Sequence, residues 1–327
     1  MANVRDCIYG QAVGDALGVP FEFRGRDTFE CTGMVGFGTH GQPVGTWSDD
    51  TSMALAICDS YRELGRIDTD DIRARFLAWY RDGAYTCDGL FDIGNATARA
   101  LIAGHGLSGE RDNGNGSLMR TVPLAFFDVT DDEVRAVSAI THAHQASTEA
   151  CVQMVHVAKA LAGGMPVGDA VAMGGVDAGK PRGSISSGGY VLHTYEAALW
   201  CLANTSSYAE CVLTAVNLGD DTDTTAAVAG ALAGIVYSFD GIPSRWIDAL
   251  RGKDVILSRR ACCRWAAWGA VRLAHQLESQ SVVDASAHLA YSVFSPVLCE
   301  AELLRQCDHA LVARPGLGED ALASMGF

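Results

Sequence analysis

Apolar residues recur at helical spacing along much of the chain, with glycine or polar breaks between the runs. The period is plainest over Asp49 to Leu64, Ala146 to Ala162 and Ser258 to Leu277. Strands with alternating apolar and polar positions are hard to find, and the many alanine and leucine residues favour helices. The pattern therefore predicts an all-α fold.

The sequence shows no internal repeat, low-complexity tract or charged linker. Its 327 residues, 49% of them hydrophobic, are enough to bury a large core, and the length allows one large domain or two ordinary ones. Two acidic clusters lie far apart in the sequence, as expected if one domain folds around them. We therefore expect one compact helical domain over residues 1–278, followed at 279–327 by a C-terminal extension of one or two helices and a glycine-containing tail.

Composition narrows the possible partners. A net charge of -15 argues against a broad electrostatic grip on nucleic acid, as a polyanion, or on an anionic membrane. The acidic excess serves solubility, or some of the carboxylates gather to bind a cation. Eleven cysteines without a CxxC pair indicate reduced, mostly buried thiols rather than disulfides or a zinc site. Without a recognisable signal peptide or membrane span, we expect a cytoplasmic protein.

The two acidic clusters stand at predicted helix starts. One is Ser48 to Asp50, and the other is Asp221 to Thr224 with Asp220 before it. Plain helix capping is the alternative for each cluster alone. Capping uses only one such side chain, however, and adjacent carboxylates repel one another unless a hard cation relieves them. Together the clusters offer roughly four to six oxygens, enough for one or two octahedral sites.

Glycine-rich segments suggest close packing and anion binding. Gly10, Gly14 and Gly18 recur every four residues, and Gly230 and Gly234 lie about one turn apart, so either helix could be approached closely by another. The loop at 112–117 exposes backbone N–H groups that can bind phosphate, and the one at 186–189, followed by Tyr190, suits an anion or a sugar against an aromatic face. Simple connections would look the same.

Two other motifs give weaker evidence of a functional site. The G-x-G-x-x-G string at 104–109 follows a helical stretch rather than a strand, so a dinucleotide-binding site is not predicted there. His142 and His144 are two residues apart and cannot share a helix face. Hydrogen-bonded core positions explain them better than a metal pair does. Glu22, seen alone, would be a solvated acid at a helix end.

Six motifs in order resemble those of the ADP-ribosylglycohydrolase family, which includes dinitrogenase reductase-activating glycohydrolase. They are GQAVGDALGVPFE, GTWSDDTSM, NGNGSLMR, ITHAH, SSGGYVLHTYEAALW and NLGDDTDTTAAVAGALAG, and the resemblance as a whole spans roughly residues 5 to 275. The resemblance implies a compact, orthogonal multi-helix bundle with a binuclear Mg²⁺ or Mn²⁺ site. It also implies an enzyme that hydrolyses the bond between ADP-ribose and a protein side chain or a related conjugate.

The resemblance also implies roles for individual residues. The implied metal ligands are Ser48, Asp49, Asp50, Asp221, Asp223 and Thr224. The implied ADP-ribose contacts are Asn113, Gly114, Asn115, Gly116, Ser117, Met119, His142, Gly188, Gly189 and Tyr190. Glu22 matches a glutamate near the metals, and we expect catalytic roles for Glu22, Asp49, Asp50 and Asp223. Two positions depart from the family pattern, Ser48 for threonine and Asp220 for glycine, and the extra carboxylate could alter the metal preference.

An expected reaction follows from this resemblance. The metals would fix the ribose and polarise a water, while the carboxylates act as bases and stabilise positive charge on the sugar ring. Arginine-linked ADP-ribose is the first expected substrate, because a guanidinium leaving group needs little general-acid help. A serine linkage or a free conjugate is the alternative. The competing class is a non-catalytic ADP-ribose-binding or crystallin-like structural protein, against which the complete ligand set argues.

Overall fold

The computed structural model describes residues 2–256, and the regular elements in this range are helices. The α-helices are α1 (Val4–Gly18), α2 (Asp49–Leu64), α3 (Thr69–Asp82), α4 (Asn95–Ala103), α5 (Asp131–Ala139), α6 (Gln145–Ala162), α7 (Val167–Met173), α8 (Val191–Ala203), α9 (Tyr208–Val216), α10 (Thr222–Tyr237), α11 (Ser244–Ala249) and α12 (Lys253–Ile256). Short 3₁₀ turns are η1 (Val19–Phe21), η2 (Leu118–Arg120), η3 (Val122–Phe126), η4 (Arg182–Ser184) and η5 (Phe239–Gly241). In this range β pairing is confined to two isolated bridges, so the all-α prediction is confirmed.

The helices predicted from periodicity lie where expected. The helix predicted over 49–64 is α2, with the same bounds, and the one predicted over 146–162 is α6, which begins one residue earlier. Gly65, in the left-handed conformation at φ 69°, ends α2. The helix predicted over 258–277, the domain boundary at 278 and the extension at 279–327 lie outside the described residues.

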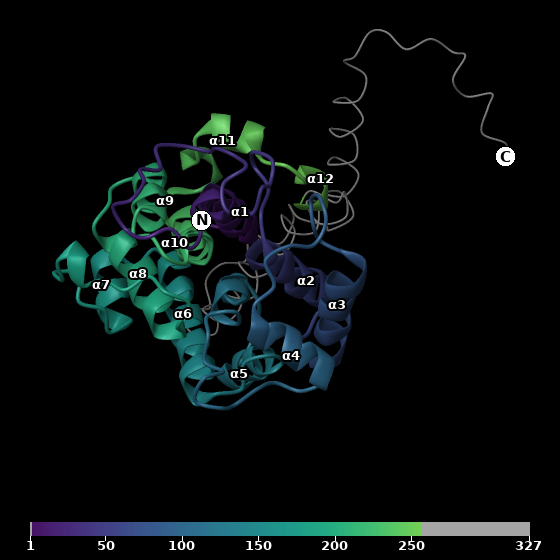
Figure 1. Cartoon of the computed structure of the whole chain (residues 1–327). Coiled ribbons are helices and arrows are strands. Elements are labelled where there is room, and N and C mark those ends of the chain that lie inside the picture. Colours follow the sequence, from purple (N-terminus) through teal and green to yellow (C-terminus); the bar gives the residue numbers. More distant parts are fainter. Residues whose placement is uncertain (1, 257–327) are drawn as a thin grey trace, which may run out of the picture. The chain divides into compact units, whose positions relative to one another are not determined.

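The core of the described region is the pair of helices α1 and α10, which pack side by side (Figure 1). Their glycines face one another, so the backbones touch. A Cβ atom on Gly14 would lie 2.1 Å from the carbonyl oxygen of Ala226, and one on Gly230 would lie 2.4 Å from that of Gly10. The close approach expected from the glycine spacing is confirmed. It places the C-terminal end of α1 next to the start of α10.

Other helices surround this pair. Helices α8 and α9 pack against α10. Helix α2 packs against α1 and, on its other side, against α3 (Figure 1). Helix α6 packs against α5 and α8. The start of α2 and the start of α10 are both buried where they meet α1, which is the arrangement that places the two acidic clusters in one region.

Two expectations from composition concern thiols and membranes. All seven cysteines in the described range are free, and six of them are buried, in agreement with reduced core thiols. Between residues 2 and 256, no helix combines the length and the hydropathy that a bilayer span needs.

Candidate active site

A buried carboxylate of α1 holds the start of α2. Asp15 Oδ1 accepts a hydrogen bond from the Ser48 backbone N–H at 2.9 Å. Its Oδ2 accepts from the N–H and the hydroxyl of Thr51, at 3.1 and 2.6 Å. The Ser48 hydroxyl accepts from the Asp50 N–H at 3.3 Å and caps the helix. Asp49 and Asp50 are therefore fixed in the first turn of α2, beside α1.

The second acidic cluster lies against the first. Helix α10 has Asp221 as its N-cap and Asp223 in its first turn. The Thr224 hydroxyl donates to Asp50 Oδ2 at 3.3 Å, although the two residues are 174 positions apart in the sequence. Carboxylate oxygens of Asp15, Asp50 and Asp223 all lie within 4.8 Å of one another. The packing of α1 against α2 and α10 thus joins the two clusters into one site.

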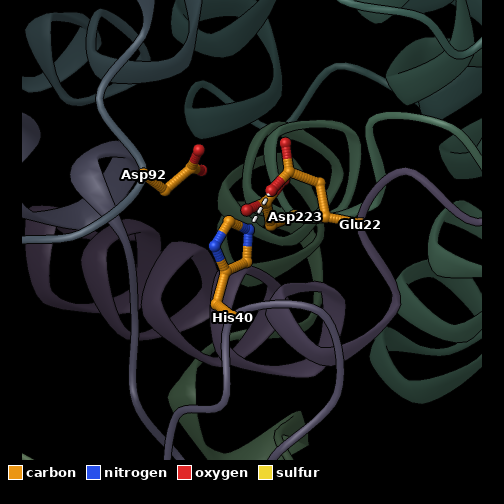
Figure 2. Close-up of side chains that lie close together, drawn as sticks. All are labelled: Glu22, His40, Asp92 and Asp223. Atoms are coloured by element: carbon orange, nitrogen blue, oxygen red, sulfur yellow. Dashed lines mark hydrogen bonds and ion pairs between the residues drawn. The ribbon is translucent and has the colours of Figure 1, made fainter.

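A second group of possible ligands shares Asp223. Ligand atoms of Glu22, His40, Asp92 and Asp223 lie within 4.8 Å of one another, and Figure 2 shows the four side chains converging from different parts of the chain. His40 Nε2 pairs with Glu22 Oε2. Glu22 follows η1, His40 comes from the loop between η1 and α2, and Asp92 comes from the loop before α4.

Several carboxylate oxygens of the site are buried without a partner. Asp50 Oδ1, Asp221 Oδ1 and Asp223 Oδ2 accept no hydrogen bond within the described range. Burial raises the pKa of Asp50 and Asp223 well above the usual range, and repulsion from neighbouring carboxylates raises the pKa further. Buried acceptors that repel one another are stabilised by a bound cation, and oxygen ligands suit a hard one. The residues present therefore fit a metal site.

Glu22 is buried, so its interpretation as a solvated acid at a helix end is wrong; its residue exposure is 5%. The pKa of Glu22 is raised to about 7, because the effect of burial outweighs that of the hydrogen bond with His40, which lowers the pKa. The His40 ring has two aromatic neighbours, with its centroid 6.0 Å from that of Phe23 and 5.4 Å from that of Phe91. Glu22 can thus exchange a proton near neutral pH in a partly apolar setting.

The two glycine-rich loops pair with each other beside the acidic clusters. The backbone N–H of Asn115 donates to the Gly189 carbonyl at 3.0 Å, and that of Val191 donates to the Asn113 carbonyl at 3.1 Å. The Asn115 side-chain amide donates to Asp221 Oδ2 at 2.8 Å. The loops at 113–117 and 188–190 therefore form a single wall next to the second acidic cluster.

The other residues predicted to contact ADP-ribose lie around this wall. Gly114 pairs with Tyr190 in an isolated antiparallel bridge. Gly116 lies against His142, since a Cβ there would be 2.8 Å from the ring carbon Cε1. Gly188 is half-buried, and Asn115 and His142 are buried. Their role in binding ADP-ribose stays a prediction.

Two of the predicted contacts are buried, and a neighbouring histidine caps a helix. Ser117 and Met119 are buried, and the Ser117 hydroxyl accepts from Ser138 at 2.9 Å. The backbone carbonyl of Met119 accepts from the side chain of Gln11, which also donates to the Asp50 carbonyl. His144 caps α6 by accepting from the Ala146 N–H at 3.2 Å. In the free protein, Ser117 and Met119 thus connect the loop at 113–117 to the buried residues beneath it.

Asp220, the extra acid of the second cluster, is exposed and belongs to neither group of possible ligands. Its φ of 59° is in the left-handed region, which glycine adopts freely and aspartate tolerates. Its backbone N–H donates to the Arg24 carbonyl at 2.8 Å, and its carbonyl accepts from Phe23 at 2.7 Å. The residue connects the segment after Glu22 to the start of α10, and this geometry gives no support to an effect on metal preference.

Sequence reasoning missed His40 and Asp92 and assigned no role to Asp15. His40 and Asp92 stand in loops with no periodic pattern, so nothing in their own surroundings marks them. The importance of Asp15 could have been detected from the sequence. A charged residue within the glycine-spaced run of α1, which otherwise packs against α10, is conspicuous in a core helix.

Comparisons of the sequence with known proteins point to a single family. The sequence model of the ADP-ribosylglycohydrolase family matches residues 1–282. An ADP-ribosylarginine hydrolase, Tri1, of Serratia proteamaculans (strain 568) is 35% identical over 274 residues, which cover 76% of this chain and 75% of the relative. The ADP-ribosyl-[dinitrogen reductase] glycohydrolase of Rhodospirillum rubrum is 31% identical over 272 residues, covering 74% of this chain and 87% of the relative.

A solved structure has the same fold. It is titled an ADP-ribosylglycohydrolase-related protein complex, has a TM-score of 0.68 and 33% sequence identity, and covers 80% of this chain and 98% of its own. The family match spans residues 1–282, a range that contains both acidic clusters and both glycine-rich loops. The chain therefore belongs to the ADP-ribosylglycohydrolase family of hydrolases.

Proposed function

We propose that this protein releases ADP-ribose from arginine side chains of modified proteins, using two divalent cations, Mg²⁺ or Mn²⁺. The observation that carries the proposal is the meeting of the two acidic clusters next to the paired glycine-rich loops. The substrate class is supported by the names of two relatives, one acting on ADP-ribosylarginine and one on ADP-ribosylated dinitrogen reductase.

The cations would be held by the two helix starts. Their proposed ligands are Ser48, Asp49, Asp50, Asp221, Asp223 and Thr224. The unpartnered oxygens of Asp50, Asp221 and Asp223 support this set, since each is a buried acceptor without a donor in the described residues. Bound there, the cations would neutralise the carboxylates and polarise the ribose hydroxyls and a water molecule.

The chain's own groups supply the rest of the reaction. Glu22 is the proposed general base, because its pKa of about 7, raised by burial, suits proton transfer near neutral pH. It takes a proton from the water whose oxygen attacks the anomeric carbon, while the bond from that carbon to the arginine nitrogen breaks. His40, hydrogen-bonded to Glu22, fixes the orientation of this carboxylate. Asp49 and Asp223 stabilise the positive charge that develops on the ribose ring.

The paired loops would bind the ADP-ribose moiety. Backbone N–H groups of a polar, glycine-rich loop are suited to phosphate oxygens, and glycine lets the ligand approach the backbone. Gly114 and Gly116 are half-buried rather than fully enclosed, and Gly189 is exposed beside Asp221. This wall is therefore open to a ligand on the side of the acidic cluster.

Arginine is favoured over serine by the chemistry of the leaving group. A guanidinium group spreads its positive charge over three nitrogens and needs little general-acid help, whereas an alkoxide leaving group would need a strong acid. The groups that converge around Asp223 are carboxylates and one histidine already paired with Glu22. With cations bound, these carboxyl groups would be ionised, so the site would supply bases rather than a strong acid.

The proposal is tested by incubating the full chain with ADP-ribosylated arginine peptides and serine peptides, with Mg²⁺, with Mn²⁺ or with chelator. We expect free ADP-ribose from the arginine peptide only when metal is present. Release from serine alone would overturn the linkage, and release in chelator would overturn the metal dependence. Tight ADP-ribose binding without release from any substrate would favour a non-catalytic binding protein.

The metal ligands are tested separately. Asp223→Asn and Asp49→Asn should each lower bound metal and turnover together, because each removes a charged oxygen ligand. Metal content by mass spectrometry and release of ADP-ribose are measured on the same samples. Asp70→Asn, at an exposed position in the first turn of α3, is the matched control and should change neither. Full metal content in both site variants would contradict the assignment.

A further inference from the structure

Arg120 is a buried cation without a carboxylate partner in the described residues. Its Nη1 donates to the Gly116 carbonyl at 2.8 Å, and its Nη2 donates to the Thr141 hydroxyl at 2.8 Å and to the Val137 carbonyl at 3.3 Å. Its guanidinium carbon lies 4.7 Å from the centroid of the Phe76 ring. A buried charge is unfavourable unless hydrogen bonds satisfy it, so these oxygens fix where the guanidinium lies.

The Thr141 hydroxyl lies between this guanidinium and His142. Thr141 Oγ1 is 2.8 Å from His142 Nδ1 as well as 2.8 Å from Arg120 Nη2. A guanidinium nitrogen can only donate, so the hydroxyl oxygen accepts from Arg120. The hydroxyl proton is then free to be donated, and His142 Nδ1 is the acceptor that the structure offers it. This arrangement favours the tautomer in which Nδ1 carries no proton and the ring proton lies on Nε2.

His142 is also kept neutral. Burial, together with the nearby charge of Arg120, lowers the pKa of His142 to about 3, so the ring carries a single N–H at physiological pH. Nε2 has no hydrogen-bond partner among residues 2–256. It lies beside the glycine-rich loop, because a Cβ atom on Gly116 would be 3.4 Å from it and one on Gly114 would be 3.7 Å.

We propose that Thr141, held by Arg120, is a positioning residue that sets the tautomer of His142, so that Nε2–H is a permanent donor to an oxygen of ADP-ribose. The identity of the ligand rests on the proposed function. The tautomer is a property of the free protein. Without the Thr141 hydroxyl, the proton could move to Nδ1, and Nε2 would then present a lone pair to the ligand oxygen and repel it.

Nitrogen NMR tests the tautomer directly. With ¹⁵N-labelled histidine, long-range ¹H–¹⁵N correlations show which ring nitrogen carries the proton, and His142→Gln assigns the signal among the nine histidines. We expect one neutral Nε2–H form between about pH 6 and 8. A Nδ1–H form or a cationic ring in the unaltered protein would overturn the proposal, whether or not any variant folds.

Three variants test the role of the hydroxyl. Thr141→Val keeps the volume and removes the hydroxyl, so the His142 signal should shift toward the Nδ1–H form and the affinity for ADP-ribose should fall about tenfold, the effect of one hydrogen bond. Thr141→Ser should restore both properties. Thr205→Val, in the connection between α8 and α9, removes a hydroxyl that donates to the Cys201 carbonyl at 2.8 Å, away from His142, and should leave both unchanged.

The two proposals fail separately. Unchanged tautomer and affinity in folded Thr141→Val, or loss of both in Thr141→Ser, would remove Thr141 from this role. Thermal unfolding of each variant shows whether it is folded. If the unaltered protein bound no ADP-ribose while His142 kept the Nε2–H form, the proposed ligand would be wrong and the tautomer assignment would stand.

Discussion

At the scale of single residues, burial determines what the charged side chains can do. Glu22 and Asp15 are both buried, and burial raises the pKa of each to about 7. Their surroundings differ, however. Asp15 accepts hydrogen bonds from the start of α2, whereas Glu22 pairs with the single side chain of His40. The Asp15 carboxylate therefore stabilises the start of α2, whereas the Glu22 carboxylate is available for proton transfer.

Replacing Glu22 with Gln should separate catalysis from metal binding. The amide keeps the shape and cannot accept a proton from water, so we expect kcat to fall by about 10²- to 10⁴-fold, the usual contribution of a general base. Bound metal should stay the same, because Glu22 is not among the proposed metal ligands. Both are measured on ADP-ribosylated arginine peptide, with the exposed Glu30→Gln as the matched control. Undiminished turnover in Glu22→Gln would remove this residue from the catalytic groups.

At the scale of elements, the site depends on how closely α1 and α10 approach each other. The contact runs along glycines of both helices, and the last glycine of α1, Gly18, lies against the backbone of Asp223. A larger residue anywhere along this contact would push the start of α10 away from α2. The hydrogen bond from Thr224 to Asp50 joins those two helix starts and would be lost with it.

Gly14→Ala tests this dependence. Its Cβ would lie 2.1 Å from a backbone carbonyl oxygen that no side-chain rotation can move, so we expect a loss of about 3 kcal/mol or more in the free energy of unfolding, with lower metal content. Gly168→Ala in α7 is the control, because no atom lies within 4 Å of its Cβ position. It should leave stability unchanged or raise it by up to ~1 kcal/mol. Equal stability of the two variants in denaturant titrations would contradict the argument.

At the scale of the whole molecule, the buried acids link stability to pH and to metal. Asp15 and Glu22 have pKa values raised from 3.8 and 4.5 to about 7, so the metal-free folded protein holds protons that the unfolded chain has released. Their stabilising effect is complete below about pH 4 and is lost as pH rises through about 7. A cation held by the neighbouring carboxylates would favour the ionised forms of Asp15 and Glu22, which lie beside Asp223, and the folded protein should then tolerate higher pH.

Thermal unfolding with chelator and with saturating Mn²⁺ measures this linkage. The gain in Tm on adding metal should be larger at pH 8 than at pH 5, by at least ~3 °C, the shift that about 1 kcal/mol produces in a domain of this size. Taking the difference between the two conditions cancels the ordinary ion pairs of the surface, which titrate in both. A gain that is equal at the two pH values would show that the buried acids are not coupled to the metal.

Much of the fold was determined by the sequence alone. Helices α2 and α6 were predicted within one residue, and both acidic clusters were placed at helix starts, because periodicity and capping are local properties. The glycine spacing likewise indicated close helix contact. These signals need only neighbouring residues, so no knowledge of the tertiary structure was required to detect them.

Only the tertiary structure decided how the site is assembled. His40 and Asp92 join Glu22 and Asp223 through loops that have no periodic pattern, and burial of Glu22 depends on the segments packed around it. The exposure of Asp220 likewise follows from a left-handed backbone at a loop end. Convergence and burial arise from contacts between residues far apart in the sequence, and local patterns carry no record of such contacts.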